Sequence, residues 1–184
     1  MYYANINSKG QLIGIGKCML DTDEFGSKNV QNIEASEEYY NNYVQYGEDY
    51  YIYQNGEIVL NPEYNAKKLQ EAKENKILEN DITRDEALIK GILYNNILFD
   101  SDTDQKANIL GAVLQMSDTD TIPWFGMNND CLTCTKQDLL NIGELITALH
   151  SFCWNRNAEI KEQIKNASTI EEVNNIEIDY EIGG

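Results

Sequence analysis

Positive charge is scarce in this sequence. Its 184 residues include 14 Lys and Arg against 31 Asp and Glu, which gives a formal net charge of −17, and only Arg84 and Arg156 are arginines. Nucleic-acid binding requires a basic surface that neutralises phosphates, and anionic lipid attracts the same kind of surface. The composition therefore argues against nucleic-acid partners and against attachment to an anionic membrane.

Long hydrophobic runs and a secretion signal are missing as well. No apolar run approaches the roughly 20 residues of a membrane-spanning helix, and residues 1–5 (MYYAN) have neither the basic nor the apolar region of a signal peptide. Four cysteines in 184 residues do not form a disulfide framework. We therefore expect a protein made in a cytoplasm, without membrane insertion.

The remaining composition is sufficient for a folded protein. Hydrophobic residues make up 42% of the chain and aromatic residues 10%, with only 2 Pro. A chain of this length can bury a core in one medium domain or in two small ones.

Residues 1–61 predict a small β-rich module for attachment. The stretches 2–6 and 12–20 flank a turn that ends at Gly10, and Asn55-Gly56 separates two apolar runs, which is typical of β-hairpins. The acidic stretch 21–29 is predicted as a loop.

A short helix is predicted after Ser36, which can cap it. Four side chains recur there at helical spacing and are expected to form its packed face: Tyr39, Tyr40, Tyr43 and Val44.

Residues 62–82 predict a connecting helix. Pro62 suits a first helical turn, and the following residues favour helix but carry only a thin apolar stripe. We expect this helix to be exposed to solvent. Self-association as a trimeric coiled coil is an alternative, although the heptads are not sustained.

Residues 83–184 predict a second α+β module. A hairpin is expected from Ala87 to Phe99 around Asn95-Asn96, followed by a helix to Met116 that Ser101 and Asp104 would cap. The expected packing residues of this helix are Ile109, Leu110, Val113 and Leu114.

The rest of this module is dominated by one long predicted helix. After a loop at 117–123 and a strand at 124–127, Thr135 and Asp138 form a capping pair for a helix over 136–166. Its apolar stripe is Leu139, Ile142, Ile146, Leu149, Cys153, Ile160, Ile164 and Ala167. A short helix that starts at Ser168 is expected to follow. The chain as a whole is predicted to be α+β, with the hairpin of this module packed against its long helix.

Two residue patterns raise the possibility of metal binding. Cys131, Cys134, His150 and Cys153 have the thiolate and imidazole groups that bind zinc, and the first two could instead form a redox dithiol. Cys153 also lies on the apolar stripe, so packing is the favoured interpretation. The run 100–104 (DSDTD) resembles the start of a calcium loop, but it lacks the glycine and glutamate that such a loop needs, and helix capping explains it better.

Signatures of known enzyme sites are absent. The sequence has no phosphate-binding loop, no nucleotide-binding glycine pattern and no nucleophile elbow, and it has a single histidine. We therefore assign no catalytic residue and no cofactor.

The order of residues in the second half resembles a known family. The matching positions include Gly91, Tyr94, the run 99–102 (FDSD), the run 123–125 (PWF) and the run 167–169 (AST). Residues 83–180 are in this respect similar to an uncharacterised C-terminal domain that recurs in bacteriophage tail and tail-fibre proteins. The first module is similar, more loosely, to short N-terminal modules of phage tail proteins. The 22 asparagines and the scarcity of arginine fit a phage or prophage of an AT-rich bacterium.

The resemblance implies a structural part of a virion. We expect a structural or accessory protein of a phage tail or tail-like particle, at the baseplate or tail fibre, made in the host cytoplasm. Its partners would be other tail, baseplate or fibre proteins, with homo-oligomers also possible. The alternatives are an assembly chaperone that is absent from the particle and, less favoured, a cell-envelope hydrolase or a zinc-binding protein.

Overall fold

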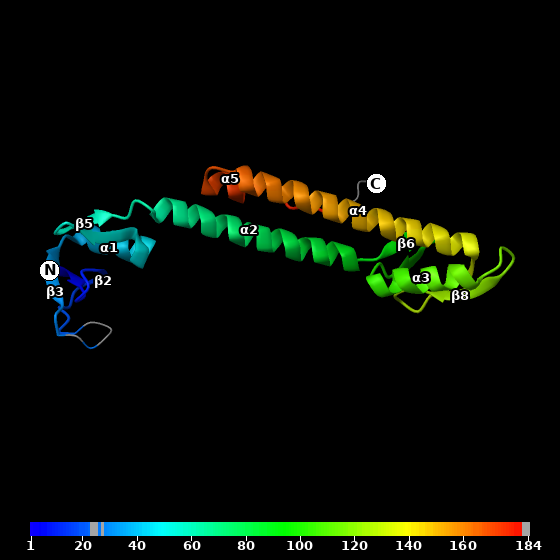
Figure 1. Cartoon of the computed structure of the whole chain (residues 1–184), viewed down its shortest axis with the longest axis horizontal. Helices are drawn as coiled ribbons and strands as arrows, with labels where there is room; N and C mark the ends of the chain where they lie inside the picture. The colour runs from blue at the N-terminus through cyan, green and yellow to red at the C-terminus, as the bar shows by residue number, and fades with distance from the viewer. Residues whose placement is uncertain (23–25, 27, 182–184) are drawn as a thin grey trace. The chain divides into compact units, whose positions relative to one another are not determined.

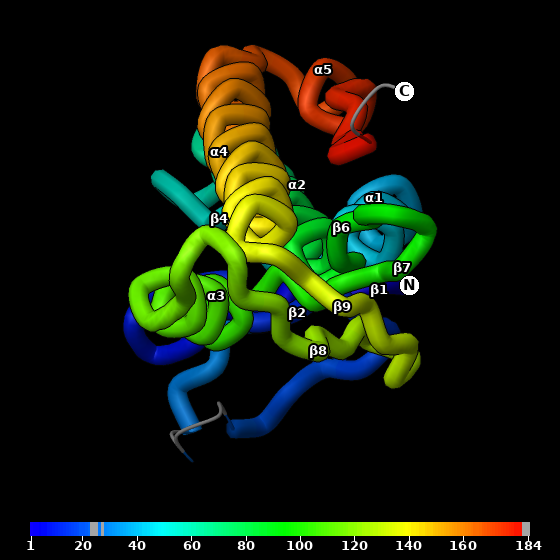
Figure 2. The backbone as a smooth tube through the Cα atoms, turned by 90° about the vertical axis from the view of Figure 1, so that its right-hand side faces the viewer, coloured from blue at the N-terminus to red at the C-terminus, as the bar shows by residue number. Residues whose placement is uncertain are grey.

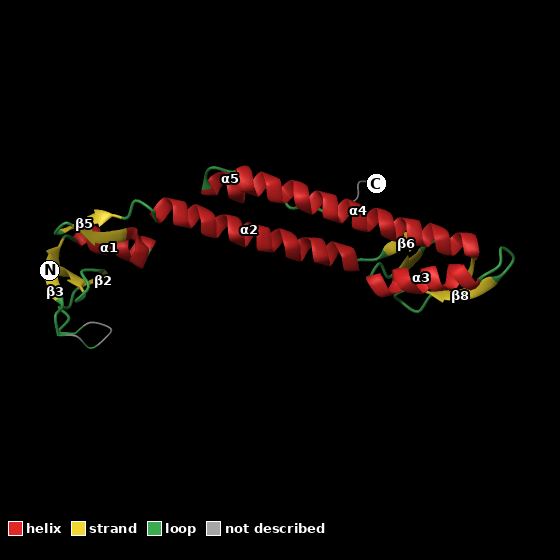
Figure 3. Cartoon of the chain, viewed as in Figure 1, coloured by secondary structure: helices red, strands yellow, loops and turns green. Residues whose placement is uncertain are grey.

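The computed structural model describes residues 1–22, 26 and 28–181 (Figure 1). Part of the loop expected at 21–29 therefore lies outside the described residues. The chain forms two compact units, residues 1–68 and 69–184. Both combine helices with small antiparallel sheets, so the fold is α+β as predicted (Figure 3).

The first unit is built on a three-stranded antiparallel sheet. Its strands are β1 (Tyr2–Ile6), β2 (Leu12–Gly16) and β3 (Gln31–Ala35), and β1 lies in the centre. The hairpin of β1 and β2 was predicted, although β2 ends at Gly16 and not at residue 20. The sequence analysis missed β3, whose alternation is weak because only Ala35 is buried in it.

The remaining elements of the first unit close a tyrosine-rich core. Helix α1 (Glu37–Tyr46) begins at the predicted cap, where the Ser36 hydroxyl accepts a hydrogen bond from the backbone N–H of Tyr39. A 3₁₀ turn, η1 (Glu48–Tyr50), leads into the predicted hairpin of β4 (Tyr51–Gln54) and β5 (Glu57–Leu60).

Rings of this unit pack in pairs. Tyr2 stacks on Tyr40 with 4.4 Å between ring centroids, and Tyr39 meets the edge of Tyr51 at 5.0 Å. The prediction for the helix face was wrong at Val44, which is 65% exposed.

Helix α2 (Tyr64–Ile89) is longer than predicted. It was expected to end at residue 82 and to give way to a strand from Ala87, but it continues until Gly91 adopts a positive φ of 85°. Its second half is also not an exposed connector, because Ala87 is buried and both Ile77 and Leu88 pack against the core of the second unit. The thin apolar stripe of α2 wrongly suggested an exposed helix, because part of the contact between α2 and the rest of the second unit is made by polar side chains.

The hairpin and helix that follow α2 are close to the prediction. Strands β6 (Ile92–Tyr94) and β7 (Ile97–Phe99) pair through a turn in which Asn95 and Asn96 both have positive φ. Helix α3 (Thr103–Gln115) is capped by Asp102, whose carboxylate accepts the N–H of Gln105, and not by the predicted pair of Ser101 and Asp104.

A second hairpin leads into the longest helix. Strand β8 (Thr121–Phe125) pairs with β9 (Cys131–Thr135), and the strand starts earlier than expected, inside the predicted loop. Pro123 is tolerated because β8 lies in a two-stranded sheet and needs hydrogen bonds on one side only. Helix α4 (Lys136–Asn166) begins and ends as predicted. In Figure 2, β9 continues directly into α4, and α3 lies next to the first part of α4.

The predicted stripe of α4 forms the core of the second unit. All eight of its residues are buried. Their neighbours come from α2, from both hairpins, from α3 and from the C-terminal segment, so one helix face gathers most of the unit. A last short helix, α5 (Ile170–Asn174), is capped by Thr169 and not by the predicted Ser168. No helix within the described residues is both long and apolar enough to cross a membrane.

The start of α4 is fixed by a reciprocal capping box. The Thr135 hydroxyl accepts the backbone N–H of Asp138, and the Asp138 carboxylate accepts the backbone N–H of Thr135 at 2.8 Å. The Tyr94 hydroxyl also donates to this carboxylate at 2.7 Å. Hydrogen bonds from the side chain of Thr135, from Tyr94 and from the Thr135 backbone lower the pKa of Asp138.

This arrangement predicts a pH-dependent loss of stability in Asp138→Asn. The free energy of unfolding at neutral pH should fall by about 1 kcal/mol, because the charge that favours the helix N-terminus is lost. A carboxylate with a lowered folded pKa stabilises above its unfolded pKa, and that contribution is lost as pH falls through the folded value. The difference between wild type and variant should therefore shrink in acid.

Urea denaturation at neutral and acidic pH measures this difference. Asp130→Asn, at an exposed aspartate in the turn between β8 and β9, is the matched control and should leave stability unchanged. A difference between Asp138→Asn and wild type that does not change with pH would contradict the role given to the carboxylate.

Candidate functional site

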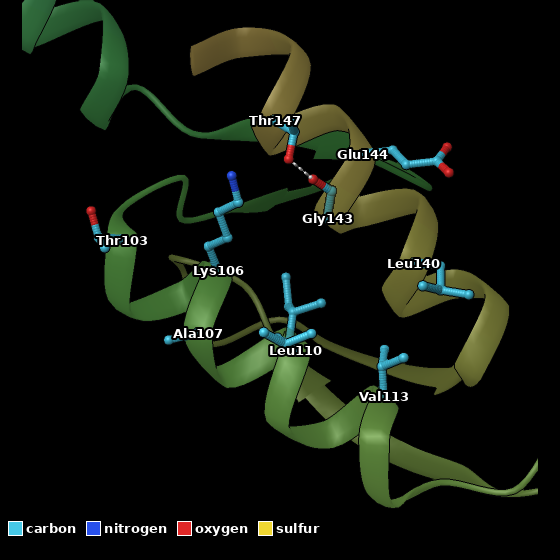
Figure 4. Close-up of a pocket in the computed structure, with 10 residues that line it drawn as sticks. Thr103, Lys106, Ala107, Leu110, Val113, Leu140, Gly143, Glu144 and Thr147 are labelled. Carbon is cyan, nitrogen blue, oxygen red and sulfur yellow. Dashed lines mark hydrogen bonds between the residues drawn. The ribbon is translucent and has the colours of Figure 1, made fainter. Parts of the chain in front are cut away.

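Helices α3 and α4 form an open groove on the second unit. They lie side by side, and Figure 4 shows Thr103 near the Thr147 end of the groove and Val113 near the Leu140 end, so the helices run antiparallel. The groove has a volume of about 460 Å³. Its lining residues are Thr103, Lys106, Ala107, Ile109, Leu110, Val113, Leu140, Gly143, Glu144 and Thr147.

The apolar lining exists because α3 has two apolar faces. Successive helical residues point about 100° apart, so the adjacent apolar residues Ile109 and Leu110 extend the apolar surface of α3 beyond the side that packs on the core. Ile109 is buried, whereas Leu110 is 60% exposed and Leu114, one turn further along the same face, is 77% exposed. The prediction that Leu110 and Leu114 pack inside was therefore wrong. Leu110 lies on the α3 side of the groove, and Leu140, 39% exposed, lies on the α4 side.

The groove has few polar lining groups. Its two hydroxyl groups belong to Thr103 and Thr147, and the Thr147 hydroxyl is occupied because it donates to the carbonyl of Gly143 at 2.8 Å (Figure 4). Its two charged side chains are Lys106 on α3 and Glu144 on α4. Such a surface suits apolar side chains of a protein partner.

The zinc candidates do not converge. Strand positions three apart point to opposite faces, so Cys131 is exposed while Cys134 is buried. His150 and Cys153 lie on α4 at least 14 residues beyond its start, and a rise of about 1.5 Å per residue carries them away from both strand cysteines along the helix. Within the residues described, no three His, Cys, Asp or Glu side chains are grouped so that they could hold a metal ion.

His150 and two of the cysteines instead have local environments that explain them. An imidazole nitrogen of His150 lies 2.6 Å from the carbonyl oxygen of Ser101, whose hydroxyl donates to the carbonyl of Leu88. These bonds connect α4 to the segment before α3 and to the end of α2. Cys134 and Cys153 are packed in the core, as the packing interpretation predicted.

Two of the thiols are buried. Desolvation, with smaller contributions from Asp138 and Cys131, raises the pKa of Cys134 to about 11. Burial also raises the pKa of Cys153. By contrast, Cys18 and Cys131 are exposed.

The run 100–104 serves the helix cap. Asp102 caps α3, and Ser101 is fully buried. The run therefore does form a helix cap, as predicted, but the capping residue differs from the predicted one.

The sequence analysis missed a buried polar cluster between α2, α4 and the C-terminal segment. Asn80 is fully buried, donates to the carbonyl of Asn157 at 3.3 Å and accepts from the Tyr180 hydroxyl at 2.6 Å. The signal was present, since Asn157 lies on the stripe of α4 between Cys153 and Ile160.

A partly buried carboxylate extends this cluster. The carboxylate of Asp81 accepts from Asn157 at 2.9 Å and from Lys161 at 2.7 Å, and it pairs with Arg84 at 3.0 Å. Burial raises the pKa of Asp81, but the hydrogen bonds from Lys161 and Asn157 and the two positive charges outweigh it, so the pKa is lowered. With its donors and acceptors paired in this way, the cluster fixes α2 on α4.

The thiol environments predict that two cysteines react rapidly with a thiol reagent and that two are protected from it. In the native protein at neutral pH, Cys18 and Cys131 should react rapidly, while Cys134 and Cys153 should react only after unfolding, because a buried thiol with a raised pKa has little thiolate. A colorimetric thiol titration with and without denaturant measures both groups. Cys18→Ser and Cys131→Ser should each remove one fast thiol, and four fast thiols in the native protein would contradict this assignment.

Comparison with known proteins gives a family but no activity. A family described as Domain of unknown function (DUF4376) matches residues 71–181, which contain the groove and the polar cluster. Neither the curated proteins nor the solved structures contain a match to the chain. Since the family match covers more than half of the sequence, this protein belongs to the DUF4376 family.

Proposed function

We propose that this protein is a structural or accessory component of a phage tail or tail-like particle, associated with the baseplate or tail fibre. It acts by holding other proteins in place and not by catalysis. The proposal of a phage tail or tail-like particle rests on the resemblance of residues 83–180 to the domain that recurs in tail and tail-fibre proteins. This stretch falls inside the matched family region.

The observation that carries the proposal is the apolar groove between α3 and α4. Among its lining residues, Leu110 is 60% exposed and Leu140 is 39% exposed. Burying such a side chain contributes roughly 1.5–3 kcal/mol. Exposed apolar surface of this kind, surrounded by polar residues, marks a protein-binding site. A partner that covers the groove therefore gains free energy that the isolated chain leaves unused.

The division into two units supports a scaffolding role. Each unit has its own core, so each can bind a different neighbour without sharing residues. In the first unit, β2 and β3 are the outer strands of the sheet. Unpaired strand edges can accept a strand from another protein, which is a common way to attach extended segments.

The proposal predicts that the protein stays with purified particles and that the groove is needed for it. Mass spectrometry of tails or tail-like particles from a bacterium that encodes the chain should detect it after washing with moderate salt. Leu110→Asp should reduce retention by at least about tenfold, because a buried unpaired charge costs several kcal/mol. The readout is the amount of the protein per particle.

A matched control separates loss of the groove from loss of solubility or folding. Leu78→Asp introduces the same charge on α2, at a side chain that is also 60% exposed but lies outside the groove. It should leave retention unchanged. Absence of the wild-type protein from intact particles would reject the proposal, and a simultaneous requirement for it in their assembly would favour the chaperone alternative.

A further inference from the structure

The two charged side chains of the groove lie on opposite helices. Lys106 and Glu144 are both exposed. Neither takes part in an ion pair in the part of the chain that the structure describes. In Figure 4, Glu144 projects from the side of α4 that faces away from Lys106, which explains why the two do not pair within one chain.

The two charges also lie at the same height along the groove. Lys106 comes three residues after Thr103, and Glu144 comes three residues before Thr147. Because Thr103 and Thr147 mark the same end of the groove and the helices are antiparallel, both charges are displaced from that end by about 4.5 Å of helical rise. The lining of the groove is therefore mostly apolar. At one position along it, a positive charge lies on the α3 side and a negative charge lies on the α4 side.

A two-fold axis along the groove would make this pattern complementary to itself. Such an axis preserves height and exchanges the two sides, so α3 of one copy faces α4 of the other. Lys106 then faces Glu144 of the other copy, and the same pair forms a second time by symmetry. The exposed leucines that line the groove, Leu110 and Leu140, would meet their counterparts of the other copy about one helical turn along the groove from these pairs.

We propose that the α3–α4 groove binds a second copy of this chain in a two-fold symmetric dimer. This inference rests on the proposed function in treating the groove as a protein-docking surface, and it names a second copy of this chain as the partner that covers the groove in the particle. The net charge of −17 on each copy opposes nonspecific association. At physiological ionic strength this repulsion is screened beyond about 8 Å, whereas ion pairs in direct contact are screened much less. Charge complementarity therefore selects this contact over other contacts between copies.

Sedimentation velocity of the full chain at physiological salt tests the dimer. The wild type should sediment as a monomer–dimer mixture that shifts to dimer as concentration rises. Lys106→Glu and Glu144→Lys should each raise the dissociation constant by at least about tenfold, because two attractive pairs become two repulsive ones. Leu110→Asp should abolish the dimer, and Leu78→Asp should leave it intact.

Combining the two charge reversals gives the decisive measurement. A mixture of Lys106→Glu protein with Glu144→Lys protein should dimerise like wild type, because both contacts between the unlike copies again join opposite charges. The double variant should also dimerise. Circular dichroism spectra that match the wild type establish that each variant is folded, so loss of the dimer is read as loss of the contact.

Three results overturn the inference: a wild type that remains monomeric at all concentrations, single reversals without effect, or no rescue in the mixture. If the wild type is monomeric but Leu110→Asp still lowers retention in particles, the groove binds a different particle protein, and the proposed function stands while the dimer is rejected. If the dimer behaves as expected but the protein is absent from particles, the proposed function fails and the dimer stands.

Discussion

The second unit depends on the register of one helix. The capping box of Thr135 and Asp138 fixes where α4 starts, and the helical period then gathers the apolar residues of its 31-residue length on one face. Since α2, both hairpins and α3 all pack on this stripe, their positions follow from it. The position of the groove depends on this stripe as well, because α3 packs on α4 through the buried Ile109.

Elements with strong local signals could be predicted from the sequence. The cap and stripe of α4, the Asn-Gly hairpin at Asn55 and the Ser36 cap are each specified by residues close together in the chain, and the structure confirms them. Strand β3 was missed because its pairing with β1 is set by a neighbour nearly 30 residues away. The extension of α2 beyond residue 82 was missed because this part packs on the core of the second unit, where Ala87 is buried.

The groove shows the limit of periodicity as a guide to a site. The pattern around Ile109 and Leu110 correctly predicts a helix with apolar residues, but spacing alone does not tell which of two adjacent apolar faces is covered. That depends on where α4 and the hairpins lie. The zinc hypothesis failed in the same way, because spacing in the sequence ignored the opposite directions of Cys131 and Cys134 on a strand. The polar cluster, by contrast, could have been detected in the sequence, because an asparagine interrupts the apolar stripe of α4.

The distribution of the cysteines provides a spectroscopic tool. Cys18 lies in the first unit and Cys131 in the second, and both are exposed, while the other two thiols are buried. A spin label or a fluorophore pair attached to the native protein therefore places one probe on each unit without any substitution. The distance between the two probes, and its spread, then reports how the units are arranged in solution and whether capture by a partner narrows that arrangement.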